Sequence, residues 1–483
     1  MITPATLDAH RAAELAVRAS YGRLVAYLAS RWRDVAAAED ALGDAFVAAL
    51  AAWPRDGVPD RPEAWLLAVA RRRLLDAGRH AAVAARVLPE LRTVVDAAHA
   101  AAASAPAFPD ERLALLFVCA HPAIDEAMRT PLMLQTVLGL DAARIAAAFI
   151  VPATTMGQRL VRVKTKIRDA GIRFEAPDAR ELPARLGPVL EAIYAAYSSG
   201  WEEDVAGAEA RRESLADEAI WLGRLVTRLL PEEPEAQGLL ALMLHCEARR
   251  AARRDEAGAY VPLSRQDVGR WDRAMIGEAE RTLYAPGQAG TAGRFQLEAA
   301  IQSAHAHRAV SGVTDWEAIA LLYEGLVRLA PTIGAQVGRA GALGEARGAS
   351  AGLAALDALP TEAVAGYQPC WALRAYLLAA LGRAAEASRA YARAIDLSRD
   401  PAVRTFLAAK EVAYGEKDDL KANFPLDRAR RAPLKRSASA PRTPCVRAVS
   451  AGQRPIVLAE IRDGGRRRIR ATWRRPGRRE IEV

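Results

Sequence analysis

Apolar residues recur at helical spacing in two segments between residues 141 and 168. In the first segment, Ile145, Ala148 and Phe149 fall on one stripe, and Asp141 can cap the N-terminus. Pro152 cannot lie inside a helix, but it suits the first turn of the next one. The apolar positions of the second segment are Met156, Leu160, Val163 and Ile167. The pattern predicts a short helix, a tight turn and a longer helix.

The polar positions of that second helix are mostly basic or amide-bearing. They are Thr154, Thr155, Gln158, Arg159, Arg162, Lys164, Lys166 and Arg168. A helix-turn-helix with this composition would place its second helix in a DNA major groove. The alternative is an ordinary helical hairpin with a solvated basic face, and this stretch alone does not decide between them.

A second amphipathic pattern lies near the N-terminus, in residues 38–53. Its apolar stripe is Leu42, Ala45, Phe46, Ala49, Leu50 and Trp53. Beside the stripe, Glu39, Asp40 and Asp44 form an acidic shoulder. Such a helix can dock on a basic partner, and the alternative is a core helix with a solvated edge.

A loop and another helix follow. Prolines, a glycine and aspartates in residues 54–62 predict a structured loop. The next helix carries Trp65 near its start and a basic strip of Arg71, Arg72, Arg73 and Arg79. Aromatic and arginine side chains beside a loop suit unstacked single-stranded bases and their phosphates.

Composition favours an all-α chain. Alanine and arginine dominate the 483 residues, and alternating β-branched runs are rare before the tail. No apolar run is long enough for a membrane span, and the N-terminus lacks the apolar core of a secretory signal. We therefore expect a cytoplasmic protein without membrane contact. The scattered cysteines, Cys119, Cys246, Cys370 and Cys445, are expected to be buried free thiols.

Charge is distributed unevenly. The formal net charge is +9, but residues 421–483 hold 18 basic and 5 acidic residues. The rest of the chain is therefore slightly acidic, and any nucleic-acid contact must depend on local patches. Given its charge and poor core content, we expect the segment 411–483 to be disordered. The alternatives are a hairpin around Asp463 and two glycines, or a stretch added by a shifted reading frame.

Candidate chemistry is sparse. Cys119 and His121 lie close together, but no third group that would orient a base is evident. His305 and His307, two positions apart, do not share a helix face and are a poor metal pair. No metal, no cofactor and no enzymatic activity are expected. An enzyme using the interrupted helical region of residues 252–276 is the weakest of the hypotheses.

The two N-terminal patterns together resemble a known family. Residues 38–76 resemble region 2 of bacterial sigma factors, and residues 110–174 resemble region 4. In this order they are similar to an extracytoplasmic-function sigma factor. The closest resemblance is to the subgroup with a C-terminal extension of tetratricopeptide-like helices, and it covers roughly residues 11–410. Residues 376–410 carry the best repeat, with Leu381-Gly382, Tyr391 and Pro401.

The resemblance implies a role for each segment. The helix at residues 40–53 would bind the β′ clamp of core RNA polymerase, through Glu39, Asp40, Asp44, Phe46 and Trp53. Contacts with the melted −10 element would come from Arg55, Asp56, Asp60, Arg61, Trp65, Arg71, Arg72, Arg73 and Arg79. Contacts with the duplex −35 element would come from Thr154, Thr155, Gln158, Arg159, Arg162, Lys164 and Lys166. The polymerase β subunit and promoter DNA are the other implied partners.

Two positions and one longer stretch depart from the family pattern. Arg144 replaces the usual glutamate of the first helix of the motif, and Gly157 removes a side chain from an expected base-facing position. Residues 331–348 are rich in glycine and lack the usual asparagine, so we expect looser packing there.

The sequence thus predicts five parts: a region 2 domain at 11–80, a linker at 81–110, a region 4 domain at 111–175, a helical extension at 181–410 and a basic tail at 411–483. The expected function is promoter-specific transcription initiation, modulated by the extension through a regulatory protein or the other domains. The alternative is a tetratricopeptide-type adaptor whose N-terminal helices are only a scaffold.

Overall fold

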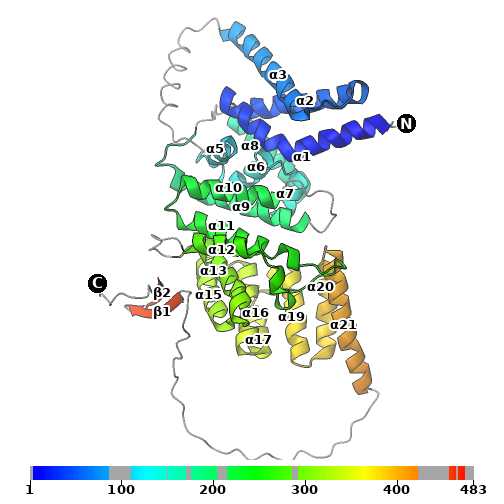
Figure 1. Cartoon of the computed structure of the whole chain (residues 1–483), viewed down its shortest axis with the longest axis vertical. Coiled ribbons are helices and arrows are strands. Elements are labelled where there is room, and N and C mark those ends of the chain that lie inside the picture. The colour runs from blue at the N-terminus through cyan, green and yellow to red at the C-terminus, as the bar shows by residue number, and fades with distance from the viewer. Residues whose placement is uncertain are drawn as a thin grey trace, which may run out of the picture. The chain divides into compact units, whose positions relative to one another are not determined.

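The computed structural model describes residues 4–85, 110–149, 151–169, 176–203, 215–284, 292–422, 456–463 and 466–473. They form two compact units, Met1–Leu244 and His245–Val483. Apart from one two-stranded hairpin near the C-terminus, both are built from helices, as Figure 1 shows, so the expected all-α class is confirmed. Among the described residues, no helix combines the length and apolarity that a membrane span needs.

Three helices open the first unit: α1 (Pro4–Trp32), α2 (Val35–Asp56) and α3 (Pro62–Ala85). Asp34 caps α2 by accepting a hydrogen bond from the backbone N–H of Ala37 at 2.9 Å. Apolar side chains from all three helices pack together and are fully buried, including Leu28, Leu42 and Leu66.

The loop after α2 is shorter than the sequence predicts. Helix α2 continues through Pro54 to Asp56, and only residues 57–61 separate it from α3. A proline costs a helix one backbone hydrogen bond, but in the last turn few further bonds depend on it. Gly57, with φ of +85°, then ends the helix in a conformation that favours glycine.

Four shorter helices follow: α5 (Glu111–Cys119), α6 (Glu126–Thr136), α7 (Ala142–Ala148) and α8 (Ala153–Asp169). Aspartates cap three of them, because a carboxylate at this position accepts from otherwise unpaired N–H groups. Asp110 caps α5 and Asp125 caps α6. Asp141 accepts from the backbone N–H of Arg144 at 2.9 Å, which confirms the predicted cap of α7.

The first unit also contains the start of the expected extension. Helices α9 (Leu182–Glu203) and α10 (Leu215–Leu229) pack against α5 and α6. The guanidinium of Arg112 lies 2.6 Å from the carboxylate of Glu218 and 4.3 Å from the ring centre of Trp221. The buried Arg185 donates to the carbonyl oxygen of Phe117. The boundary expected near residue 181 therefore lies inside one packed body, and the unit ends at Leu244.

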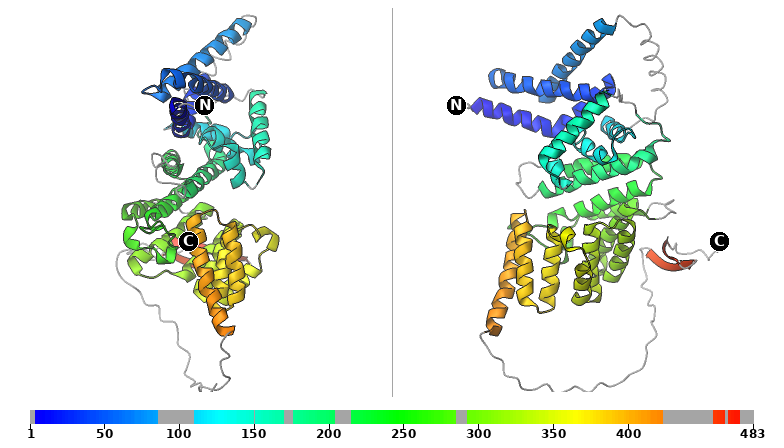
Figure 2. Two further views of the ribbon diagram at one scale, coloured as in Figure 1. Left: turned by 90° about the vertical axis from the view of Figure 1, so that its right-hand side faces the viewer. Right: turned by 180° about the vertical axis from the view of Figure 1, so that it is seen from behind.

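The second unit consists of successive helices that mostly run antiparallel to their neighbours (Figures 1 and 2). After α11 (Pro234–Glu247), which crosses the unit boundary, come short 3-10 turns at Arg250–Ala252, Leu263–Arg265 and Val268–Arg270. The remaining helices are α12 (Arg273–Leu283), α13 (Arg294–Ala306), α14 (Arg308–Ser311), α15 (Trp316–Leu329), α16 (Ile333–Arg347), α17 (Ala349–Asp357), α18 (Thr361–Val364), α19 (Gln368–Ala380), α20 (Ala384–Leu397) and α21 (Pro401–Ala422).

The irregular segment between α11 and α12 contains a tight turn. The carboxylate of Asp255 accepts from the backbone N–H groups of Ala257 and Ala259. Gly258 adopts a φ of +79°, as such a tight turn requires. Arg254 anchors the segment through an ion pair with Asp400 at 2.5 Å.

The glycine-rich stretch at residues 331–348 is closely packed, so the expectation of looser packing is wrong. It forms α16, whose glycines let neighbouring helices approach. A Cβ on Gly338 would lie 2.5 Å from the ring of Tyr323, and one on Gly344 would lie 2.7 Å from Leu377. On α17, a Cβ on Gly352 would lie 2.8 Å from the carbonyl oxygen of Ala340.

The tail contains an antiparallel hairpin of β1 (Ile456–Asp463) and β2 (Arg466–Trp473), paired from Ile456 with Trp473 to Asp463 with Arg466. The hairpin alternative is therefore the one present here, in place of the expected disorder. Helix α21 also continues past residue 410. The disorder expected for residues 423–455 lies outside the described residues.

Candidate functional site

Helix α2 presents two different faces. Asp40 and Asp44 are exposed, and one turn after Asp44, Val47 leaves 68% of its surface exposed. On the inward side, Phe46 is half-buried and its ring lies 6.5 Å from that of Tyr21, centre to centre. Trp53 is buried, as the predicted stripe requires, but Leu50 of that stripe is 43% exposed. The exposed face is thus acidic at Asp40 and Asp44 and apolar further along, at Val47 and Leu50.

The loop and the start of α3 form the second candidate surface. Trp65 is half-buried and packs edge-on against Trp53, with ring centres 5.6 Å apart. It therefore belongs partly to the core. The other residues assigned to the −10 contact are exposed, namely Arg55, Asp56, Asp60, Arg61, Arg71, Arg72 and Arg73. Arg79 lies in α3, but its side chain is outside the described residues.

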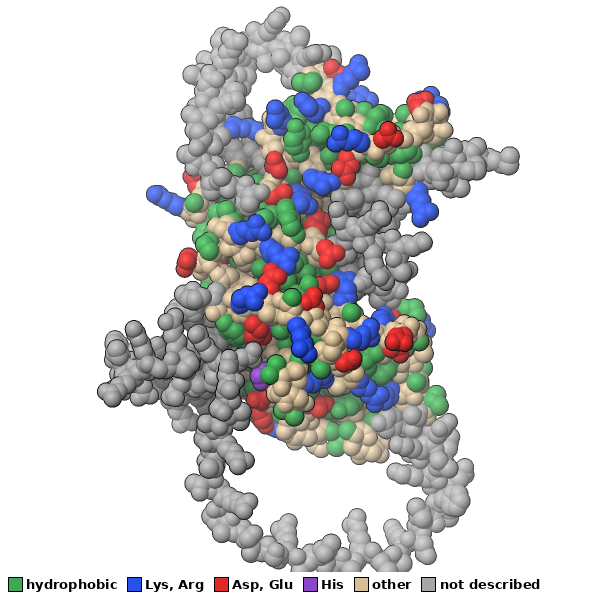
Figure 3. Space-filling view, viewed as in Figure 1, with side chains coloured by type: hydrophobic (Ala, Val, Ile, Leu, Met, Phe, Trp, Pro, Cys, Tyr) green, Lys and Arg blue, Asp and Glu red, His purple; other side chains and the backbone are tan. Residues whose placement is uncertain are grey.

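Helix α8 exposes most of the side chains assigned to the −35 contact. Thr154, Gln158, Arg159, Arg162 and Lys166 are exposed, and Thr155 is half-buried. Helix α7 packs across the buried side of α8, where Met156 and Leu160 are about 1% exposed. Basic and acidic side chains are interspersed over the face drawn in Figure 3. This face therefore carries no broad basic surface, in agreement with the uneven charge distribution in the sequence.

The structure places Gly157 close to α7. A Cβ on Gly157 would lie 3.9 Å from the Cβ of Ala142, on the side of α8 that faces α7. The side chain missing at Gly157 would therefore border α7, and a role of this position in facing a base stays a prediction. The exposed face of α8 is intact without it.

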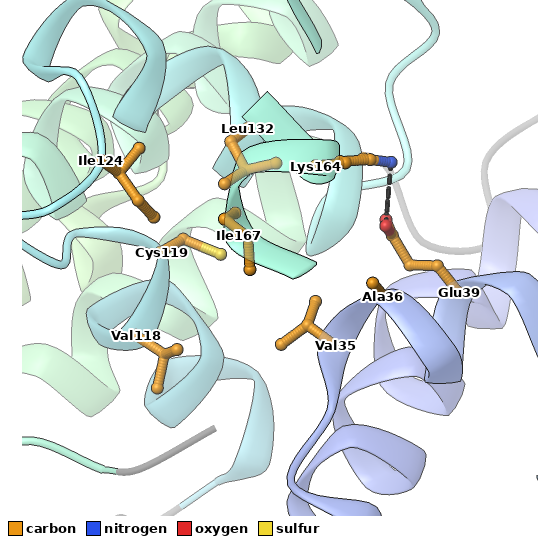
Figure 4. Close-up of a pocket in the computed structure, with 9 residues that line it drawn as sticks. All are labelled: Val35, Ala36, Glu39, Val118, Cys119, Ile124, Leu132, Lys164 and Ile167. Atoms are coloured by element: carbon orange, nitrogen blue, oxygen red, sulfur yellow. Dashed lines mark hydrogen bonds and ion pairs between the residues drawn. The ribbon is translucent and has the colours of Figure 1, made fainter. Parts of the chain in front are cut away.

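Glu39 and Lys164 do not lie on the exposed surfaces. The carboxylate of Glu39 is 7% exposed and lies 2.9 Å from the Nζ of Lys164. It also accepts a hydrogen bond from the Oγ1 of Thr136, in α6, at 2.9 Å. Figure 4 shows this ion pair where α2 meets α8. Two residues assigned from the sequence to different partners are thus bound to each other.

A small apolar cavity of about 20 Å³ lies beside the ion pair. Figure 4 shows its lining residues, Val35, Ala36, Glu39, Val118, Cys119, Ile124, Leu132, Lys164 and Ile167. A cavity of this size has room for about one water molecule. Burial, and secondly the charge of Glu39, raises the pKa of the Cys119 thiol. Burial and the carboxylates of Glu39 and Asp40 likewise raise the pKa of the Tyr21 hydroxyl.

The other residues of chemical interest have structural partners. The Nδ1 of His121 accepts from the backbone N–H of Ala123. The ring of His305 packs edge-on against that of Trp316, 5.3 Å away, and burial lowers its pKa to about 4. Within the described ranges, no three histidine, cysteine or acidic side chains gather as a metal site.

Three junction residues escaped the sequence reasoning: Gly22, Thr136 and Val137. Helix α1 approaches the end of α6 so closely that a Cβ on Gly22 would overlap the carbonyl oxygen of Val137. A signal for this contact exists, because a glycine inside a helix of good helix formers usually has a packing reason.

Comparison with known proteins identifies the family. Residues 16–83 match the family described as Sigma-70 region 2. The chain belongs to the sigma-70 family. Residues 185–285 of this sigma factor match a family of unknown function, DUF6596, which lies in the C-terminal extension. An uncharacterized protein of Rhizobium meliloti (strain 1021) is 37% identical over 413 residues, which cover 83% of this sigma factor and 93% of that protein. No solved structure matches the chain.

The family defines the general role of the sigma factor. Region 2 is the part through which sigma factors act with core RNA polymerase and promoter DNA in transcription initiation, and it corresponds here to α1–α3. The family is not one of enzymes. The match also confirms the predicted resemblance for the N-terminal part of the chain.

Proposed function

We propose that this sigma factor directs promoter-specific initiation through two DNA-reading surfaces and one polymerase-binding surface. Helix α8 reads the −35 element, and the loop at residues 57–61 with α3 holds the melted −10 element. The exposed face of α2 binds the β′ clamp of the polymerase, and α5–α8 bind near the β subunit.

The observation that carries the −35 assignment is the exposed face of α8. Gln158, Arg159 and Arg162 are exposed, while Met156 and Leu160 are buried on the opposite side and Val161 is the one strongly exposed apolar residue among those described in α8. A helix supported in this way can enter a major groove, where arginine and glutamine form paired hydrogen bonds with guanine and adenine.

The −10 assignment is supported by the surface next to Trp65. Arg71, Arg72 and Arg73 are exposed within a single turn of α3, Arg55 is exposed at the end of α2, and Arg61 is exposed in the loop. Cationic side chains around a half-exposed aromatic ring suit single-stranded bases and phosphates.

The polymerase assignment rests on the exposed face of α2. Asp40, Asp44 and Val47 are one turn apart and combine acidic groups with apolar surface. An amphipathic helix of this kind complements a basic surface with an apolar centre.

The extension is proposed to be a tetratricopeptide-like regulatory domain. Its helices pair as α15 with α16, α19 with α20 and α20 with α21. Gly382, with φ of +74°, makes the turn between α19 and α20, and Tyr391 and Ala394 are buried against neighbours. Stacked pairs of this kind offer a groove for a peptide or another domain.

Run-off transcription with purified core polymerase on a pool of random-sequence templates tests the proposal. Specific transcripts should appear only when this sigma factor is added. If the chain neither binds the polymerase nor yields specific starts, it is an adaptor and the proposal is wrong.

The Arg159→Ala/Arg162→Ala variant tests the role of α8. Loss of two base or phosphate contacts should weaken binding to a selected −35 duplex about tenfold or more and reduce its salt dependence. The matched control is Arg180→Ala/Arg399→Ala, which removes two exposed arginines away from α8. Equal binding by both variants would rule out the assignment.

A further inference from the structure

Two arginines and one tryptophan of the second unit gather in one place, and none of them has been given a role. Arg249 follows α11, Trp271 follows the third 3-10 turn, and Arg308 is the first residue of α14. The guanidinium carbon of Arg308 lies 5.1 Å from the centre of the Trp271 ring, and that of Arg249 lies 5.9 Å from it. Three separate segments of the chain therefore place two cations beside one indole ring.

The acceptors of both arginines are neutral. Arg249 donates to the carbonyl oxygen of His245 and to the side-chain oxygen of Gln302. Arg308 donates to two backbone carbonyl oxygens within residues 264–266, each at 3.0 Å. Neither arginine forms an ion pair within the part of the chain that the structure describes. In keeping with this, burial, and secondly the charge of Arg249, lowers the pKa of Arg308.

Two buried donors of this group also lack an acceptor. Arg249 is 7% exposed and Trp271 is 3% exposed. Among the described residues, neither the Nη1 of Arg249 nor the Nε1 of Trp271 has a hydrogen-bond partner. Removing a charge or an N–H group from water without a partner is costly, so buried charges are normally paired and buried donors normally have acceptors. The indole ring offsets only part of that cost, because it attracts a cation less strongly than a buried ion pair does.

We propose that Arg249, Trp271 and Arg308 bind the phosphate group of a small molecule, which is either inorganic phosphate or a phosphate monoester. A phosphate monoester carries about 1.5 to 2 negative charges at about pH 7, which matches two guanidinium groups, whereas a carboxylate would balance only one. The planar guanidinium also presents paired N–H donors that fit phosphate oxygens. The ligand is small, because the free donors of Arg249 and Trp271 lie beneath the surface.

Binding at this site would connect parts of the second unit that are separate in the chain. The half-buried Arg308 is the member of the group that solvent reaches. A phosphate held by all three residues would join the turn after α11, the irregular segment before α12 and the start of α14. Because a ligand that binds only the folded chain stabilises it, the stability of the extension should rise with ligand concentration. This site does not depend on promoter recognition, since none of its residues belongs to the surfaces assigned to DNA or polymerase.

Calorimetric titration of the full chain tests the site. The titrants are inorganic phosphate and glycerol phosphate, used separately at constant ionic strength. One phosphate group should bind per chain, and the midpoint of thermal unfolding should rise with its concentration. Sodium acetate, which supplies a monoanion, is the control and should do neither. A monoester that binds at least about tenfold more tightly than inorganic phosphate identifies a phosphorylated small molecule as the ligand, and the reverse order identifies free phosphate.

Two variants locate the binding site. Trp271→Phe keeps an aromatic ring beside the arginines and removes only the N–H donor, so phosphate should bind about tenfold more weakly. Arg249→Met removes one charge with its donors and should weaken binding by at least about tenfold. The matched control is Arg404→Gln, which removes an exposed arginine of α21 and should bind phosphate like the unmodified chain.

The midpoint of unfolding without phosphate gives a second readout for Arg249. If its charge is uncompensated, Arg249→Met should unfold at the same temperature as the unmodified chain or at a higher one, and phosphate should no longer raise that temperature. A lower midpoint together with an unchanged response to phosphate would show that Arg249 only supports the fold through His245 and Gln302.

The proposal is overturned if neither phosphate compound releases heat nor raises the midpoint, and water is then the partner of the buried donors. It is also overturned if acetate acts as strongly as phosphate, or if Trp271→Phe and Arg249→Met bind phosphate as tightly as Arg404→Gln. None of these measurements uses polymerase or DNA. Their failure therefore leaves the proposed function untouched, and a failure of run-off transcription leaves the phosphate site untouched.

Discussion

Lys164 and Glu39 are 125 residues apart in the sequence, and the Nζ of one lies 2.9 Å from the carboxylate of the other. The pair connects the helix assigned to polymerase binding with the helix assigned to −35 recognition. One ion pair therefore joins two helices to which the proposed function gives different partners.

The pair should contribute measurably to stability. We expect the Glu39→Gln and Lys164→Met variants to show a coupling free energy of about 1–2 kcal/mol in a double-mutant cycle, because Glu39 is nearly buried. Urea unfolding gives the four free energies of unfolding that the cycle needs: those of the unmodified chain, the two single variants and the double variant. Lys166→Met, on the exposed face of α8, is the control and should show no coupling with Glu39→Gln. A coupling near zero for Lys164 would refute this expectation.

Gly157→Ala should stabilise α8 without changing its DNA preference. The new Cβ would lie 3.9 Å from Ala142, an ordinary contact, and alanine favours a helix over glycine by up to about 1 kcal/mol. Thermal unfolding and selection of −35 sequences measure the two effects. An altered base preference would show that this side of the helix does face DNA.

Gly352→Ala should destabilise the second unit by about 1–3 kcal/mol, the usual penalty for an overpacked core. Its Cβ would meet the backbone of Ala340 and Gly344, and neither can move aside easily. Gly366→Ala, where nothing lies within 4 Å, is the matched control. Equal unfolding midpoints for the two variants would show that the helices relax around the added methyl group.

Acid should weaken the second unit through two histidines, the buried His245 and the partly buried His305. Burial lowers the pKa of His245 to about 3 and that of His305 to about 4. In the unfolded chain both histidines have a pKa of about 6.5. Below that pH the unfolded chain therefore binds more protons than the folded chain. The free energy of unfolding should therefore fall, by up to about 1.4 kcal/mol per pH unit for each histidine.

Glu280 acts in the opposite sense, because burial raises its pKa and proton uptake then favours the folded chain at low pH. The comparison is therefore made with Glu280 replaced in both chains, Glu280→Gln and Glu280→Gln/His305→Phe. Urea unfolding gives their free energies of unfolding from about pH 7 to about pH 5. The second variant should show a shallower loss, since phenylalanine keeps the ring contact with Trp316. If the free energy of unfolding falls with pH equally steeply in both variants, His305 does not contribute to the loss of stability in acid.

Local features of the fold could be predicted from the sequence. Asp141 caps α7 and Trp53 is buried on its stripe, because caps and helical periods are set by residues a few positions apart. The same short-range reasoning failed at Pro54, where α2 continues, and at the glycines of α16, which serve close packing and do not break the helix.

The junction could not be predicted, because it joins residues far apart in the chain. Periodicity marked Glu39 and Lys164 as polar positions, but a polar position can face water, a partner or another part of the same chain. The exposed 43% of Leu50 shows the converse, an apolar position that the fold leaves at the surface.

The packing of α9 and α10 on α5 and α6 also sets the order of events during synthesis. Residues as far apart as Leu113 and Val226 are buried in the same unit, which is complete only at Leu244. The ribosome must therefore add about 75 residues after the end of α8 before that body can close, which takes about 4–15 s at about 5–20 residues per second. A nascent chain that already carries α8 should lack its full support during that interval.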